Sequence, residues 1–200
     1  GAGCSYANVS NNKAQSNGAA GITGSGTRVN ITYNNATSNT GGGISVTNSD
    51  YFNVIWNNAS ANGNTGIGIG LVARSNFTNN TANSNALHGF HIAQSDYNRF
   101  YNNTANSNTG TLDWGFGDGF HVANYADYNY FERNTARSNA RYGFRFDDWV
   151  TYNDFKNNMA CSNPTRDLQC GTYVDPELND LGNNICSNQQ YCDILCNPGC

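Results

Sequence analysis

The chain has 200 residues, which is enough for one domain with a substantial core, and its formal net charge is −4. It contains only two lysines, so it lacks the basic face that binding to nucleic acid or to an anionic membrane requires. No apolar segment approaches the roughly 20 residues of a membrane-spanning helix. We therefore expect neither a nucleic-acid partner nor membrane insertion.

The first seven residues precede the first repeated element and contain one isolated cysteine, Cys4. No amphipathic capping segment comes before the first repeat, so we expect a neighbouring molecule or an upstream region to cover that end. As the odd cysteine of the chain, Cys4 is a candidate for an intermolecular disulfide. These features favour rods that stack head to tail, a heterologous contact that propagates into a fibre.

A phrase of the form Asn-x-Ala-x-(Ser/Ala)-Asn recurs seven times, at intervals of 22, 23, 23, 23, 31 and 24 residues. Its copies begin at Asn12, Asn34, Asn57, Asn80, Asn103, Asn134 and Asn158. Another asparagine precedes each copy by four or five residues: Asn8, Asn30, Asn53, Asn76, Asn98, Asn129 and Asn153. A glycine follows the copies, at Gly21, Gly43, Gly66, Gly89, Gly119 and Gly143. This self-similarity predicts a repeat architecture.

Apolar residues alternate after each glycine, as in Ile44 and Val46, which is the period of a strand with one face inward. A second apolar group follows each upstream asparagine, and the phrase contributes one small inward alanine. Each copy is therefore predicted to form one turn of a coil with two or three short strands. Stacked turns would pair in parallel at about 4.8 Å per coil. Asparagine side chains would hydrogen-bond along the stack, at corners that need a left-handed backbone.

This pattern resembles the Asn-rich repeats of right-handed parallel β-helices in the pectate-lyase-like superfamily, and the resemblance covers residues 8–163. It implies an all-β, single-stranded right-handed parallel β-helix, a solenoid of about seven coils of 22–24 residues. We expect this β-helix to span residues 1–163 and a Cys-rich capping segment to span residues 164–200. Proteins of this fold include polysaccharide lyases, uronate epimerases, glycosidases, tailspikes, adhesins and structural modules, so the fold alone does not choose a function.

The coil with the 31-residue interval has eight extra residues, and its loop 109–118 lies beside all three histidines of the chain. Strand alternation predicts one outward row formed by His91, His121 and Arg145, with neighbours about 4.8 Å apart. A second row stands just before the glycines and includes His88, Asp118 and Tyr142. Together with Asp113 and Trp114 of the loop, His88 and Tyr142 are candidates for holding a sugar by hydrogen bonds and stacking.

Besides a sugar-binding surface, three interpretations of this polar patch remain open. In an acidic-polysaccharide lyase or uronate epimerase, the catalytic candidates are His91, His121, Arg145 and Asp118. Arg145 or Arg141 would neutralise a uronate carboxylate, and His91 or His121 would remove the proton at C5. Alternatively, the histidines and Asp118 could bind zinc, or the patch could be an ordinary solvated face. We expect no metal and no cofactor.

An aromatic column is predicted from the residues before the upstream asparagines, and it consists of Phe52, Tyr97, Tyr128 and Tyr152 with an interruption at Ser75. Sugars stack on such strips, but like residues on neighbouring strands also pack on one another, and packing is the favoured interpretation.

Six cysteines crowd the C-terminal segment: Cys161, Cys170, Cys186, Cys192, Cys196 and Cys200. They contain no C-x-x-C pair and no histidine lies among them, so a disulfide framework is favoured over zinc, with 15 pairings open. Disulfides indicate an extracellular or cell-surface location. Candidate glycosylation sites fit that location: Asn8, Asn30, Asn35, Asn58, Asn76, Asn79 and Asn102.

The sequence as a whole favours a structural or interaction protein, a surface or fibre-forming subunit that self-associates head to tail. A carbohydrate-binding module and a polysaccharide lyase or epimerase are the alternatives, with a polysaccharide or glycan as partner.

Overall fold

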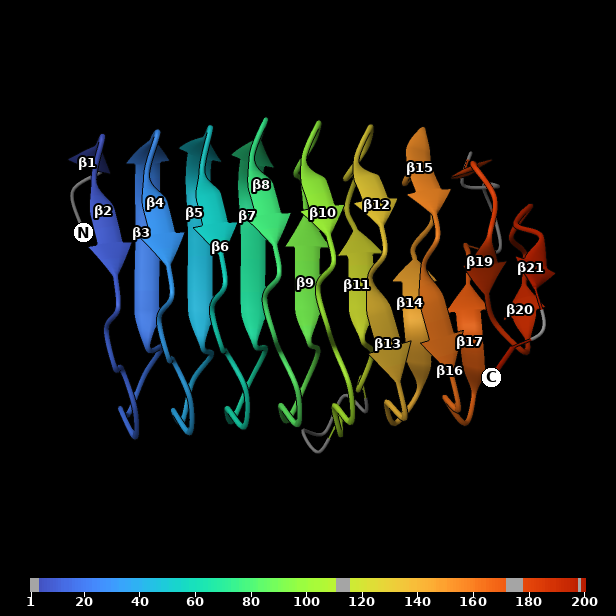
Figure 1. The fold of residues 1–200 in the computed structure, drawn as a ribbon, viewed down its shortest axis with the longest axis horizontal. Coiled ribbons are helices and arrows are strands. Elements are labelled where there is room, and N and C mark those ends of the chain that lie inside the picture. Colours follow the sequence, from blue (N-terminus) through green and yellow to red (C-terminus); the bar gives the residue numbers. More distant parts are fainter. Residues whose placement is uncertain (1–3, 111–115, 172–177, 198) are drawn as a thin grey trace.

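The computed structural model describes residues 4–110, 116–171, 178–197 and 199–200. The chain forms a rod of stacked coils with three parallel sheets, and the predicted all-β, right-handed parallel β-helix of about seven coils is confirmed. Two sheets run along the rod, and the strands of the third lie in its C-terminal half, as Figure 1 shows. All regular structure in the described residues is β. None of their segments forms a helix long and apolar enough to cross a membrane.

The first sheet contains nine strands, in spatial order β1 (Cys4–Ser5), β3 (Ile22–Thr27), β5 (Ile44–Asp50), β7 (Ile67–Ala73), β9 (Phe90–Ala93), β11 (Phe120–Ala123), β14 (Tyr142–Phe146), β17 (Arg166–Gln169) and β20 (Gln189–Gln190). The second contains β2 (Asn8–Ser10), β4 (Asn30–Thr32), β6 (Asn53–Ile55), β8 (Asn76–Thr78), β10 (Arg99–Tyr101), β12 (Tyr130–Glu132), β15 (Asn153–Lys156) and β18 (Leu178–Asp180). The third contains β13 (Thr135–Arg137), β16 (Met159–Cys161), β19 (Asn184–Ile185) and β21 (Cys196–Asn197), and single bridges between the phrases continue it toward the N-terminus.

The chain turns at three corners in each regular coil, and the residue at each corner is left-handed, with φ between 51° and 59°. One column of these corner residues is Ser16, Ser38, Ala61, Ser84, Ser107, Ser138 and Ser162. The prediction that the repeated asparagines themselves take this conformation is wrong for most of them, because the left-handed residue is the one before. Its side chain points to solvent, and the turn then directs the following asparagine inward.

The inward asparagines form the predicted ladders. The backbone N–H and the side-chain Nδ2 of Asn80 both donate to Oδ1 of Asn103, at 2.9 and 3.0 Å, and Nδ2 also donates to the carbonyl of Val54 at 2.8 Å. Both asparagines of the phrase repeat this pattern, since Asn85 donates to Asn108 in the same way. The ladders therefore satisfy buried polar groups at two of the three corners, which keeps each coil in register with the next.

The core is a set of stacked like residues. Phe90, Phe120 and Phe144 stack with ring centroids 4.6 and 4.7 Å apart, and all three rings are fully buried. Such contacts each contribute about 0.5–1.5 kcal/mol beyond the buried area. Strands of the first sheet each bury at least two apolar side chains in the middle of the rod, as β14 does with Phe144 and Phe146, and strands of the second sheet bury one, as β12 does with Phe131.

The upstream asparagines, which their spacing predicts to form one column, divide between two neighbouring columns. Asn8, Asn30, Asn53 and Asn76 are aligned, and Arg99, Tyr130 and Asp154 continue their column. Asn98, Asn129 and Asn153 belong to the preceding, buried column, where Ser75 donates its backbone N–H to Oδ1 of Asn98. Asparagine fits both columns. Aligning the coils on their upstream asparagines therefore displaces the last three coils by one residue relative to the first four.

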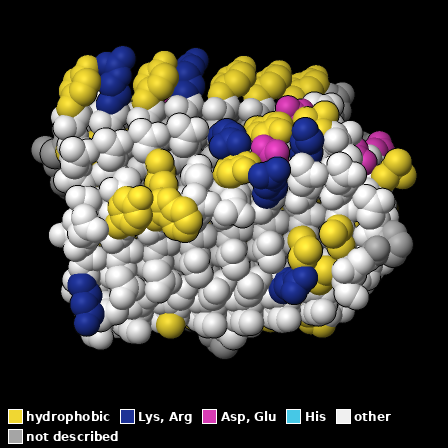
Figure 2. All heavy atoms as spheres, viewed as in Figure 1, with side chains coloured by type: hydrophobic (Ala, Val, Ile, Leu, Met, Phe, Trp, Pro, Cys, Tyr) yellow, Lys and Arg dark blue, Asp and Glu magenta, His cyan; other side chains and the backbone are white. Residues whose placement is uncertain are grey.

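This displacement changes the predicted aromatic column. Phe52 is not part of it, because Phe52 is buried and lies in the same column as Ser75. The exposed column alternates tyrosine with arginine along the rod and then becomes all tyrosine: Tyr6, Arg28, Tyr51, Arg74, Tyr97, Tyr128 and Tyr152. It forms the upper row of yellow and blue side chains in Figure 2. The rings of Tyr97, Tyr128 and Tyr152 stack face to face at 5.0 Å, so packing, the favoured interpretation, holds there.

The end of the repeated phrase at residue 163 is not the end of the coils. β17 pairs with β14, β18 with β15, and β20 with β17, because parallel main-chain pairing does not require the phrase. Three disulfides join these last coils: Cys161–Cys200, Cys170–Cys192 and Cys186–Cys196. Cys186–Cys196 connects the residue that follows β19 to the neighbouring strand β21, and Cys161–Cys200 ties the end of the chain to β16.

Candidate functional site

The polar patch lies on the outer face of the first sheet, where β9, β11 and β14 are adjacent. His91, His121 and Arg145 occupy one row in direct register, as strand alternation predicts. His88 and Asp118 stand in the row before it, and Asp118 is aligned with Tyr142. The structure thus brings together the three histidines, Asp118 and Arg145.

His121 is held by a carboxylate that the sequence analysis missed. Its Nε2 lies 2.8 Å from Oδ2 of Asp147, and Oδ1 of Asp147 forms an ion pair with Nε of Arg145 at 2.6 Å. Burial raises the pKa of Asp147, but the hydrogen bond and charge of His121 and the charges of Arg145 and Arg141 prevail and lower it. Asp147 therefore stays charged and orients both its partners. Asp147 follows Arg145 by two residues, and this strand spacing could have placed both side chains on the same outer face.

Asp118 is completely buried and paired with Arg141. Nε of Arg141 donates to Oδ1 at 2.8 Å and Nη2 donates to Oδ2 at 2.6 Å, a bidentate geometry. The guanidinium of Arg141 also lies 4.2 Å from the ring centroid of Phe116 and 4.6 Å from that of Tyr142. This pairing positions Arg141 at the edge of the patch.

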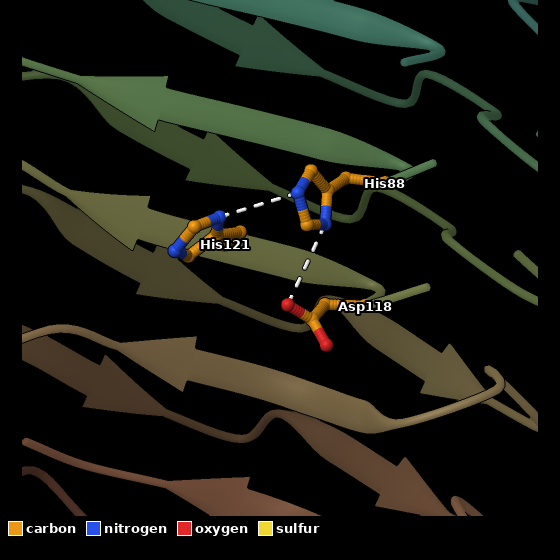
Figure 3. A group of neighbouring side chains, drawn as sticks. All are labelled: His88, Asp118 and His121. Carbon is orange, nitrogen blue, oxygen red and sulfur yellow. Dashed lines mark hydrogen bonds and ion pairs between the residues drawn. The ribbon is translucent and has the colours of Figure 1, made fainter. Parts of the chain in front are cut away.

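His88 is buried and lies next to His121 and Asp118, as Figure 3 shows. Its Nε2 lies 3.3 Å from Nδ1 of His121, and its Nδ1 lies 3.5 Å from Oδ2 of Asp118 without a hydrogen-bond partner. Burial, aided by the charges of His121, His91, Arg141 and Arg145, lowers the pKa of His88 to about 2. The imidazole of His88 is therefore neutral at neutral pH.

His91 is half-buried, and its ring centroid lies 5.1 Å from that of His121 and 5.5 Å from that of His88. Burial and the charge of His121 lower its pKa to about 4, although Asp147 and Asp118 act in the opposite direction. His91 is thus a neutral imidazole that can accept a proton from a bound molecule.

A groove of about 400 Å³ adjoins the patch on its C-terminal side. It is lined by Arg141, Tyr142, Arg145, Asp147, Gln169 and Tyr191, among others. Gln169 and Tyr191 had not been predicted, because they follow the end of the repeated phrase. The predicted loop residues Asp113 and Trp114 lie outside the described residues.

A group of possible metal ligands also lies within the patch. Ligand atoms of His88, Asp118 and His121 all lie within 4.8 Å of one another, and all three residues are buried. The arrangement supplies two imidazoles and one carboxylate, a donor set that zinc accepts.

The remaining predicted residues lie away from this face. The candidate glycosylation sites all have exposed or half-buried side chains. Cys4 lies in β1, but its side chain is outside the described part of the structure. Glycan attachment and an intermolecular disulfide at Cys4 therefore stay predictions.

The sequence profile of the family described as "Right handed beta helix region" matches residues 1–160. No curated protein matches the chain significantly. The fold is similar to the periplasmic alginate epimerase AlgG, with a TM-score of 0.65 and 20% identity over 82% of this chain and 36% of that one. It is also similar to pectate lyase Pel9A (TM-score 0.59, 15% identity, 90% of this chain and 53% of that one). The A-module of the Azotobacter vinelandii mannuronan C-5 epimerase AlgE4 gives a TM-score of 0.61 and 14% identity over 90% of this chain and 57% of that module. The chain thus spans between a third and three-fifths of these proteins.

Proposed function

The chain belongs to the right-handed β-helix family, and on that premise we propose that the outer face of β9, β11 and β14 acts on an acidic polysaccharide. The reaction is removal of the proton beside a uronate carboxylate, the step that a lyase and a C-5 epimerase have in common. The similar structures include one enzyme named as a lyase and two named as epimerases. Their sequence identity to this chain is 20% or less, so the similarity concerns the fold. The proposal therefore depends on the site of this chain.

The observation that carries the proposal is the order of side chains across three neighbouring coils. A sugar over His121 would have His91 on one side and Arg145 on the other, because the three residues are in register. Arg145 has five N–H donors, and its pair with Asp147 uses Nε. The guanidinium can therefore bind the uronate carboxylate while neutral His91 accepts the C5 proton. The groove along Arg141, Tyr142 and Gln169 would hold the neighbouring sugars.

The test is incubation of the protein with pectate, alginate and hyaluronan. Ultraviolet absorbance detects the unsaturated product of a lyase, and proton NMR detects inversion at C5. Arg145→Ala and His91→Ala should each lower the rate at least tenfold. Arg74→Ala removes an arginine from the exposed column and should leave the rate unchanged. Absence of both reactions and of binding to all three polymers would refute the proposal.

Three disulfides support an extracellular or secreted location for this activity. Head-to-tail stacking is a second proposal, and the exposure of Leu195 (81%) and Leu181 (46%) near the C-terminal end favours it. Negative-stain electron microscopy distinguishes filaments from isolated rods. Filaments that Leu195→Asp disperses would support stacking, and isolated rods at high protein concentration would contradict it.

A further inference from the structure

We propose that His88 and His121 form a binding site for a divalent transition-metal ion of the zinc class, with Nε2 of His88 and Nδ1 of His121 as the ligand atoms. This inference does not depend on the proposed activity. It rests on the distances and the hydrogen-bonding capacity of four buried or half-buried side chains.

The carboxylate of Asp147 fixes the tautomer of His121. Because Oδ2 of Asp147 lies 2.8 Å from Nε2 of His121 and can only accept, the proton of the neutral imidazole is on Nε2. The other nitrogen, Nδ1, then presents a lone pair toward Nε2 of His88, 3.3 Å away.

While His121 is neutral, neither neutral tautomer of His88 satisfies both of its ring nitrogens. With its proton on Nε2, His88 donates to His121, but the lone pair of Nδ1 then faces Oδ2 of Asp118 at 3.5 Å. With its proton on Nδ1, His88 faces Asp118 correctly, but two imidazole lone pairs then meet at 3.3 Å. His88 Nδ1 is one of two buried side-chain atoms in the described residues that lack a hydrogen-bond partner. With His121 neutral, a cation bound by Nε2 of His88 and Nδ1 of His121 would let His88 keep its proton on Nδ1, facing Asp118.

The dimensions of the gap suit a metal ion. Zinc binds imidazole nitrogen at about 2.0–2.1 Å, so two tetrahedral ligands are separated by about 3.4 Å. The observed separation of Nε2 and Nδ1 is 3.3 Å. An ion there would leave Nδ1–H of His88 directed at Asp118 and Nε2–H of His121 directed at Asp147. Such outer carboxylates commonly orient histidine ligands and raise their basicity.

A proton between Nε2 of His88 and Nδ1 of His121 is the alternative to a metal ion. If His121 carries protons on both nitrogens, its Nδ1–H donates to His88, and no metal is needed. The two occupants exclude each other and are distinguished by direct binding measurements.

The experiment uses the full chain with Cys4→Ser, which removes the one thiol outside the disulfides of the described structure. After chelation and dialysis, Zn²⁺ alone is titrated by calorimetry, and Co²⁺ is titrated by visible absorption. We expect one ion per chain and a higher urea midpoint in the presence of Zn²⁺. His88→Ala and His121→Ala should each weaken Zn²⁺ binding by at least tenfold.

Two further variants test the assignment even if a ligand variant fails to fold. Asp147→Asn keeps the shape of the side chain and should weaken Zn²⁺ binding about 10-fold to 100-fold. His91→Ala removes the third imidazole of the patch and should change the dissociation constant by less than about threefold, because the set of ligand atoms within 4.8 Å does not include His91. Wild-type protein without stoichiometric Zn²⁺, or equal losses in all three histidine variants, would overturn the assignment.

Discussion

Replacing Asn57 by alanine should lower the free energy of unfolding by about 3–5 kcal/mol. Oδ1 of Asn57 accepts from the backbone N–H and Nδ2 of Asn34, at 2.9 and 3.0 Å. Its Nδ2 donates to the carbonyls of Ile31 and Ile55 and to Oδ1 of Asn80. Alanine leaves the buried N–H of Asn34 without an acceptor, which costs about 1–3 kcal/mol, and each other lost bond adds about 1 kcal/mol or less. The interruption lies inside the stack, where water cannot replace the amide.

Urea unfolding followed by circular dichroism measures this change, and the slope must be compared as well as the midpoint because repeat proteins can unfold in parts. Asn58→Ala is the matched control, since Asn58 is adjacent in the chain and exposed. It should change the free energy by less than about 0.5 kcal/mol. If Asn57→Ala and Asn58→Ala differ by less than about 1 kcal/mol, the ladders do not stabilise the rod as argued.

Three further predictions concern other parts of the molecule. In metal-free protein, the pKa values of about 2 for His88 and about 4 for His91 mean that the unfolded chain binds more protons below pH 6.5. Their contribution to stability is therefore complete above pH 6.5 and is lost as the pH falls toward 4; a flat urea midpoint across that range would contradict it. Tyr128→Ala removes two stacked contacts at 5.0 Å and should cost about 1–3 kcal/mol by urea unfolding; no change would show that the exposed stack is energetically neutral. Reduction of the disulfides should abolish hydrogen-exchange protection in β17, β20 and β21 while β5 and β7 stay protected, and uniform loss would indicate one cooperative unit.

Strand alternation and coil spacing were sufficient to predict the fold and the row of His91, His121 and Arg145. Those residues lie on regular strands, where the position of a residue determines whether its side chain points inward or outward. Phe116 and Asp147 could not be placed in the same way, since one belongs to the irregular loop and the other follows the end of β14. The column register shifted at Asn98 because a buried and an exposed column both accept asparagine. The disulfide pairing could not be predicted, because the cysteines lie in the last coils, where the repeated phrase is absent and the length of each coil is not given by the sequence.

The asparagine ladders have a direction, and this has a consequence for how such a protein can evolve. Each ladder residue accepts from the coil before it and donates to the coil after it, as Asn34 does between Asn12 and Asn57. A tandem duplication of one regular repeat would therefore supply every donor and acceptor that its two new neighbours need. Whole repeats can therefore be gained or lost elsewhere in the rod without altering the three neighbouring coils that carry His91, His121 and Arg145. The directional ladder thus separates the length of the rod from the coils that form the chemical site.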